Sequence, residues 1–268
     1  MATYVFSDVH GHFGTLDRLL ERVSPTSDDR IFMLGDMIDR GPDPISVVKC
    51  CHELPNTTVL MGNHEDLMLS YYANINDPGA EFNWVINGAT PTQEGLKALP
   101  VEERVELARW LFTLPLYTQT EVAGRRYLLV HAGIDPRRIS HAGVDVWDEA
   151  AINKMMGNQY RDDLMWIRDD FWGQPTGLLN SEGEGPIVIA GHTPTRYLNY
   201  MADLPDRPSD NDQGLCQMVR VGACEETGGV ADRWDIDCGC AGGAGFGQLL
   251  MLRLDDGEEI YEPVREGE

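Results

Sequence analysis

The sequence is poor in basic residues. Its 268 residues include 21 Lys and Arg against 44 Asp and Glu, which gives a formal net charge of -23 at pH 7. A surface with this excess of negative charge repels nucleic-acid backbones and anionic membranes, so we expect neither as a partner. An anionic substrate would need positive charge that is concentrated locally at its binding site.

Long apolar runs are also missing. No stretch approaches the ~20 apolar residues of a membrane-spanning helix, and the first residues, MATYVFSDVHG, lack the basic region and apolar core of a secretory signal. Cysteines are few, at positions 50, 51, 216, 224, 238 and 240, and none has the paired C-x-x-C spacing of a structural zinc site. We therefore predict reduced thiols and a cytoplasmic protein, with a zinc site at the last four cysteines as the alternative.

Apolar runs and amphipathic segments alternate along the first third of the chain. The pattern predicts strands at 3–7, 30–35 and 57–62 and helices at 13–23, 42–54 and 64–75. Such alternation indicates βαβ units around a mostly buried parallel sheet. Farther along we expect a helix at 101–114, strands at 125–134 and 185–195, and a short helix running into a loop at 162–172. A loop-rich acidic insertion at 201–233 and a final hairpin turning at DDG complete the prediction. No linker divides the chain, so we predict a single domain over residues 1–268.

Five of these predicted strands end in polar residues beside a glycine. The five segments read SDVHGH, GDMIDRG, GNHED, VHAGI and AGHTPT, and they contain Asp8, His10, Asp36, Asn63, His131 and His192. Because ligands of open α/β sheets bind at the carboxyl ends of strands, we expect these side chains to converge. Asp8 and His10 are two residues apart and would share one face of an extended backbone.

Carboxylate, amide and imidazole groups together suit a first-row divalent metal such as Mn, Fe, Zn or Co. Six candidate ligands are enough for two ions, and Asp36 is the candidate that bridges them. A single Asp after a strand is commonly a cap or turn residue, and a single His is commonly a buried polar group. Their coincidence at five strand ends favours a metal site. His12, His52 and His141 lack such a setting, and we expect them at the surface.

The motifs DVHGH, GDMIDRG, GNHE, VHAG and GHTP resemble the calcineurin-like metallophosphoesterases. The resemblance is to the phosphoprotein phosphatase branch, which includes serine/threonine phosphatases of bacteria and phages, and it covers the chain from Asp8 to at least Pro194. It implies an α/β fold, a four-layer α/β/β/α sandwich with two mixed sheets.

The resemblance also implies a role for each matching residue. The first metal would be held by Asp8, His10 and Asp36, and the second by Asp36, Asn63, His131 and His192. His64 would be the general acid, oriented by Asp39. Arg40 and Arg168 would bind the phosphate, although a structural salt bridge to Asp169 or Asp170 is the alternative for Arg168. The two divalent ions, Mn in bacterial and phage relatives or an Fe–Zn pair, would supply a bridging hydroxide as nucleophile.

The substrate is the least determined part of this interpretation. A serine/threonine protein phosphatase, acting on phosphomonoesters of phosphorylated proteins, is the first prediction. The alternative is a symmetrical diadenosine tetraphosphatase: VHAGI and GHTPT look more like that branch, but it generally lacks an acid at the position of Asp39. Inorganic oligophosphate hydrolysis is a third possibility. An inactive binding protein on the same fold is opposed by the presence of every expected ligand and of His64.

Overall fold

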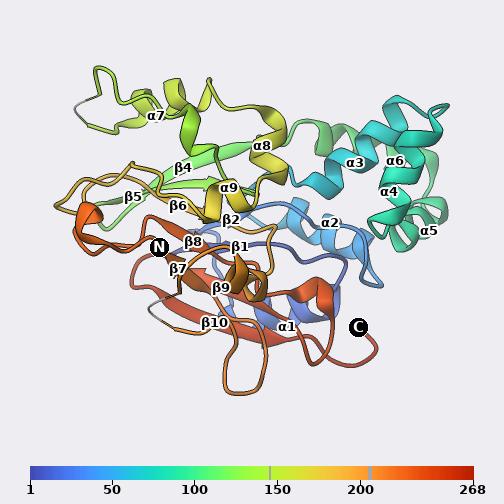
Figure 1. The fold of residues 1–268 in the computed structure, drawn as a ribbon. Helices are drawn as coiled ribbons and strands as arrows, with labels where there is room; N and C mark the ends of the chain where they lie inside the picture. Colours follow the sequence, from blue (N-terminus) through green and yellow to red (C-terminus); the bar gives the residue numbers. More distant parts are fainter. Residues whose placement is uncertain (145, 205–206) are drawn as a thin grey trace. The chain divides into compact units, whose positions relative to one another are not determined.

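The computed structural model describes residues 1–144, 146–204 and 207–268. Cα packing divides the chain into two compact units. The first comprises Met1–Pro115 with Gly239–Glu268, and the second comprises Leu116–Cys238. Each unit is built on its own five-stranded sheet (Figure 1). The single domain expected over residues 1–268 stays a prediction.

The sheet of the first unit has the strand order β10-β9-β1-β2-β3. Its strands are β1 (Thr3–Phe6), β2 (Arg30–Met33), β3 (Thr57–Val59), β9 (Gln248–Arg253) and β10 (Glu258–Pro263). β1, β2 and β3 run parallel, whereas β9 pairs antiparallel with both β1 and β10. The carboxyl ends of β1, β2 and β3 therefore lie at the same edge of this sheet.

Helices connect these strands and then gather beyond β3. α1 (Phe13–Val23) buries Leu16 and Leu19, and α2 (Pro44–Glu53) begins with a proline in its first turn and Asp43 accepting a hydrogen bond from the Ser46 N–H. After β3 come α3 (Asn63–Ala73), α4 (Pro78–Ile86), α5 (Thr90–Ala98) and α6 (Val101–Phe112), which form one group in Figure 1. The sequence did not predict α4 and α5.

The sheet of the second unit has the strand order β4-β5-β6-β8-β7. Its strands are β4 (Tyr117–Val122), β5 (Arg125–Val130), β6 (Ile187–Ala190), β7 (Val219–Val221) and β8 (Arg233–Asp235). β5, β6 and β8 are parallel, and β4 and β7 pair antiparallel at the two edges. The helices of this unit are α7 (Glu149–Met156), α8 (Arg161–Trp166) and α9 (Asp169–Trp172). Short 3-10 turns cover Pro136–Arg138, Thr195–Tyr200 and Glu225–Thr227 here, and Cys240–Gly242 in the first unit.

The predicted α/β fold with two mixed sheets and flanking helices is confirmed. The segment 162–172, predicted as a short helix running into a loop, begins in helix α8. Ile167 then takes an extended conformation, and a second short helix, α9, follows it. The predicted loop-rich insertion, residues 201–233, includes residues 205–206, which the structure does not describe. Its described residues contain strand β7 and the first residue of β8. All six cysteines are free thiols.

No helix in the ranges described is long and apolar enough to cross a membrane.

Candidate metal centre

Three polar residues stand at the shared strand edge of the first unit. Asp8 follows β1, Asp36 follows β2, and Asn63 opens α3 after β3. Their exposed fractions are 1%, 2% and 2%. Buried carboxylates are costly unless a cation or hydrogen-bond donors compensate their charge. Because β1, β2 and β3 are adjacent and parallel, the residues that follow them lie at one sheet edge, as the sequence predicts for these three positions.

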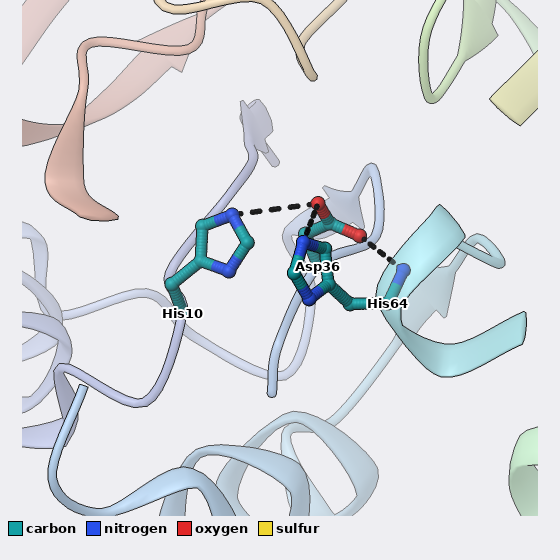
Figure 2. A group of neighbouring side chains, drawn as sticks. All are labelled: His10, Asp36 and His64. Carbon is teal, nitrogen blue, oxygen red and sulfur yellow. Dashed lines mark hydrogen bonds and ion pairs between the residues drawn. The ribbon is translucent and has the colours of Figure 1, made fainter. Parts of the chain in front are cut away.

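His10 faces both carboxylates with the same ring nitrogen. Its Nδ1 lies 3.0 Å from the Ile38 carbonyl oxygen, which can only accept, so Nδ1 carries the proton and Nε2 presents a lone pair. That Nε2 lies 3.4 Å from Asp36 Oδ2 (Figure 2). It also lies 4.0 Å from Asp8 Oδ1. Burial lowers the pKa of His10 well below its usual value, against the opposing charge of Asp36. A lone pair aimed at buried carboxylate oxygens fits a bound cation, with the Ile38 carbonyl fixing the ring.

The backbone at these positions is left-handed, a conformation that non-glycine residues rarely adopt. The residues and φ angles are Asp8 (55°), His10 (46°), Asp36 (61°), Asp39 (68°), Arg40 (68°) and His192 (67°). The extended backbone predicted for Asp8 and His10 is therefore wrong: β1 ends at Phe6, and a tight turn brings the two side chains together. Such strain is concentrated at functional sites, where the surrounding structure must hold it.

His64 is fully buried between two different partners. Its Nδ1 lies 2.7 Å from Asp39 Oδ2, and its Nε2 lies 3.0 Å from Nη2 of Arg40. Asp36 also approaches it: Oδ1 accepts the His64 backbone N–H at 3.0 Å, and Oδ2 lies 3.9 Å from Nε2 (Figure 2). Burial opposes a charged imidazole, but the carboxylates of Asp36 and Asp39 outweigh it and raise the pKa of His64. The predicted Asp39–His64 pair is present.

Glu65 has a structural function that the sequence analysis did not assign. It is fully buried, and its carboxylate accepts the backbone N–H groups of Asp36 (2.9 Å), Met37 (2.8 Å) and Ile38 (3.3 Å). Burial and the neighbouring charge of Asp36 raise the pKa of Glu65 to about 7. These bonds hold the turn that carries Asp36. An acid at the third position of a helix, as in GNHE, is a capping signal that could have pointed to it.

Trp84 and Thr92 were also missed. The Trp84 indole N–H and the Thr92 hydroxyl both donate to the Asp39 carboxylate, and both side chains are fully buried. Trp84 lies in α4 and Thr92 in α5. The sequence analysis selected candidate residues at strand ends, so it did not identify these two helical residues.

Two predicted ligands lie together in the second unit. His131 directly follows β5, and His192 follows β6, the neighbouring parallel strand. Both are buried, and their ring centroids are 5.1 Å apart. The ring of Trp166 stands edge-on to His192 with centroids 5.8 Å apart. The parallel order of β5 and β6 thus places both imidazoles at one edge of this sheet.

Arg168 lies two residues beyond Trp166, at the start of α9, and is half-buried. In the portion of the chain that is described, its guanidinium forms no ion pair. Asp170 instead accepts a hydrogen bond from Arg137 at 2.9 Å. The salt bridge weighed as an alternative for Arg168 is therefore not found there, and the side chain is available to a ligand.

The three other histidines differ from one another. His52 and His141 are exposed, as expected, and contact Trp110 and Trp147 edge-on. The surface position predicted for His12 is wrong, because it is only 4% exposed. His12 precedes α1 and its ring packs close to Gly41, where a side chain at that glycine would meet it.

A pair of mixed sheets with buried carboxylates and imidazoles after the strands is the arrangement of a metal-dependent phosphoester hydrolase. The chain belongs to the calcineurin-like phosphoesterase family, because its residues 1–214 match the sequence pattern that defines this family.

Several bacterial relatives of the chain are named "Bis(5'-nucleosyl)-tetraphosphatase, symmetrical". The relative from Vibrio parahaemolyticus is 25% identical over 288 residues, covering 96% of both chains. That from Dechloromonas aromatica is 30% identical over 182 residues, covering 66% of this chain and 58% of the relative. Matches to further bacterial relatives of this name span about half the length of those proteins.

Solved structures share the fold at lower identity. One, provisionally named a diadenosine tetraphosphatase, has a TM-score of 0.57 at 20% identity and covers 99% of this chain and 94% of its own. A serine/threonine phosphatase from Saccharomyces cerevisiae has a TM-score of 0.51 at 16% identity, covering 100% and 81%.

Proposed function

We propose that the chain is a two-metal phosphoester hydrolase that cleaves symmetrical dinucleoside tetraphosphates. The observation that carries the proposal is the correspondence with the Vibrio relative, which bears that name and aligns over 96% of both chains. It reverses the order of the two functions predicted from the sequence, in which the serine/threonine protein phosphatase came first.

The metal ligands in this proposal are those implied by the motifs. Asp8, His10 and Asp36 would hold one ion, and Asn63, His131 and His192 the other, with Asp36 shared. Oxygen donors mixed with imidazole suit Mn, as well as an Fe–Zn pair. When bound, the two ions supply an activated water and neutralise charge on the phosphoryl oxygens.

The other residues act on the phosphate and on the leaving group. Arg40 is exposed and carries five donors in a planar fork, which suits two phosphoryl oxygens. Arg168 would add a second guanidinium. His64 would donate a proton from Nε2 to the departing oxygen as the P–O bond breaks, while Asp39 holds its Nδ1 at 2.7 Å. This local positive charge answers the question raised by the acidic composition.

A protein phosphatase remains the second candidate function because of one contact. The Asp39–His64 pair is present. The resemblance given in the sequence analysis implies that an acid at the position of Asp39 distinguishes the phosphatase branch from the tetraphosphatase branch.

The test compares two substrates with the Mn-loaded protein. We expect kcat/KM for diadenosine tetraphosphate to exceed that for a phosphoserine peptide at least tenfold, with two molecules of ADP as the only products. The reverse ratio would assign the chain to the protein phosphatases. Absence of turnover with Mn, Fe, Zn and Co on both substrates would overturn both candidates.

A further inference from the structure

Besides its contact with His64, the carboxylate of Asp39 accepts hydrogen bonds from two further side chains, Trp84 and Thr92. The Trp84 Nε1–H reaches both oxygens, Oδ1 at 3.2 Å and Oδ2 at 3.0 Å. The Thr92 hydroxyl donates to Oδ1 at 2.6 Å. His64 Nδ1 takes the remaining position on Oδ2 at 2.7 Å. Donors on both oxygens leave the carboxylate little freedom to rotate, so the direction it offers to His64 is fixed.

The backbone that carries Asp39 is tied to the same segment. The Asp39 N–H donates to the Thr92 hydroxyl at 2.9 Å, and the Arg40 N–H donates to the Gly88 carbonyl at 3.0 Å. Both Asp39 and Arg40 have a φ of 68°. Two consecutive left-handed residues are unfavourable unless neighbouring groups hold them. Thr92 supplies part of that support, because its hydroxyl accepts the Asp39 backbone N–H and also donates to the Asp39 carboxylate.

Trp84 is the one residue of α4 that is buried. Its flanking residues Phe82, Val85 and Ile86 are exposed at 63%, 42% and 62%. The indole packs against Tyr71 of α3, with ring centroids 5.3 Å apart. A buried indole N–H needs an acceptor, and here that acceptor is Asp39. Helix α4 thus buries a single side chain, Trp84, and its indole N–H donates to Asp39, the residue that contacts His64.

We propose that Trp84 and Thr92 are positioning residues, which fix Asp39 and through it direct the His64 imidazole toward the leaving oxygen. The proposal rests on the proposed function only in taking His64 as the proton donor, and it holds for either candidate substrate. Neither residue contacts the reacting groups. Their effect should therefore appear in the step that needs a proton and not in phosphate binding.

The test uses leaving groups of different basicity with the Mn-loaded protein. p-Nitrophenolate leaves without a proton, whereas phenolate is a stronger base and needs one. Thr92→Val removes the hydroxyl at constant shape, Thr92→Ser keeps it, and Trp84→Phe removes the N–H but keeps an aromatic ring. The matched control is Thr176→Val in the second unit, because Thr176 is also buried and donates to a buried carboxylate, Asp232, at 2.7 Å.

Thr92→Val and Trp84→Phe should lower kcat on phenyl phosphate about tenfold or more, and kcat on p-nitrophenyl phosphate by less than about threefold, because only the first ester depends on proton transfer. Thr92→Ser should restore the phenyl phosphate rate. Thr176→Val should leave the ratio of the two rates unchanged.

Equal losses on both esters would overturn the positioning role and leave a structural one. A wild-type protein that hydrolyses neither diadenosine tetraphosphate nor a phosphoserine peptide with any of the four metals would instead refute the proposed function, so the two failures are distinguishable. Circular dichroism and the melting temperature of each variant show whether it is folded.

Discussion

Arg40 Nη2 lies 3.0 Å from His64 Nε2, so an exposed guanidinium covers the ring nitrogen of a fully buried imidazole. A guanidinium has donors only, so Nε2 accepts this bond and the ring proton sits on Nδ1, facing Asp39. Phosphate is a stronger partner for a guanidinium than a neutral imidazole is. A bound phosphoester would therefore compete for Arg40 and free Nε2 to take up a proton, which the carboxylates of Asp36 and Asp39 favour by raising the pKa of His64. The imidazole could then pass that proton from Nε2 to the leaving oxygen.

The role of His64 can be separated from metal binding by His64→Asn. The ligand atoms of His10, Asp36 and His64 all lie within 4.8 Å of one another, so geometry alone permits His64 as a ligand. We expect a fall in kcat of about 10²–10⁴-fold on a phenyl ester, the usual contribution of a positioned acid. Metal content, measured by elemental analysis, should stay at two ions per chain.

His52→Asn is the matched control, since His52 is exposed on α2 and should change neither quantity. Loss of metal from the His64 variant would show that this residue is a ligand and would remove it as the acid.

The bridging role of Asp36 predicts that Asp36→Asn weakens both ions together. Its two carboxylate oxygens already face different neighbours: Oδ1 accepts the His64 N–H, and Oδ2 lies 3.4 Å from His10 Nε2. An amide offers one neutral oxygen and cannot bridge two cations. Titration calorimetry should show both Mn sites weakened, whereas Asp8→Asn should weaken one. A fully retained site in the Asp36 variant would contradict bridging.

The sequence alone predicted the strands that carry the candidate ligands, because each strand is encoded by a local run of apolar residues. Apolar runs located β1, β2, β3, β5 and β6, and the parallel order of the first three strands brings Asp8, Asp36 and Asn63 to one edge. The same reasoning located His131 and His192 beside each other in the second unit. Strand direction, which the alternating pattern predicts, is enough to bring such residues together.

The supporting contacts were not predictable in this way. Trp84 and Thr92 are 45 and 53 residues from Asp39, and α4 has a single inward side chain in place of an apolar stripe. A hydrogen bond over that separation depends on how α4 and α5 pack, which no local pattern encodes. The left-handed backbone at Asp36 and Arg40 was also unforeseen, because neither is glycine and tertiary contacts impose it.

Backbone strain at Arg40 predicts an unusual order of stability for two truncations. Arg40→Ala and Arg40→Gly both remove the guanidinium, but only glycine adopts a φ of 68° without steric cost. Arg40→Gly should be the more stable by about 1 kcal/mol in urea unfolding. Glu106, exposed within α6, is the control: there the Gly variant should be less stable than the Ala variant by about 1 kcal/mol. The same order at both positions would show that Arg40 carries no strain.

Asp29 predicts an acid-dependent loss of stability away from the candidate centre. It precedes β2, is buried, and accepts the backbone N–H groups of Ala2 and Thr26 and the Thr26 hydroxyl. These bonds lower the pKa of Asp29 to about 2 from 3.8. A pKa lowered on folding stabilises the protein above the unfolded value and ceases to do so as pH falls through the folded one. The contribution should therefore be complete above about pH 5 and be lost progressively as the pH falls from 5 to 2, amounting to about 2 kcal/mol.

Asp29→Asn should remove this part of the pH dependence, so the difference in unfolding free energy between wild type and variant should shrink as the pH falls from 5 to 2. Asp28→Asn makes the same charge change at the neighbouring exposed residue and should leave the wild-type profile intact. Denaturant unfolding at a series of pH values measures both. A difference for Asp29→Asn that stays constant across this interval would mean that its carboxylate is not selectively stabilised by folding, since the pH slope reports only the change in proton uptake.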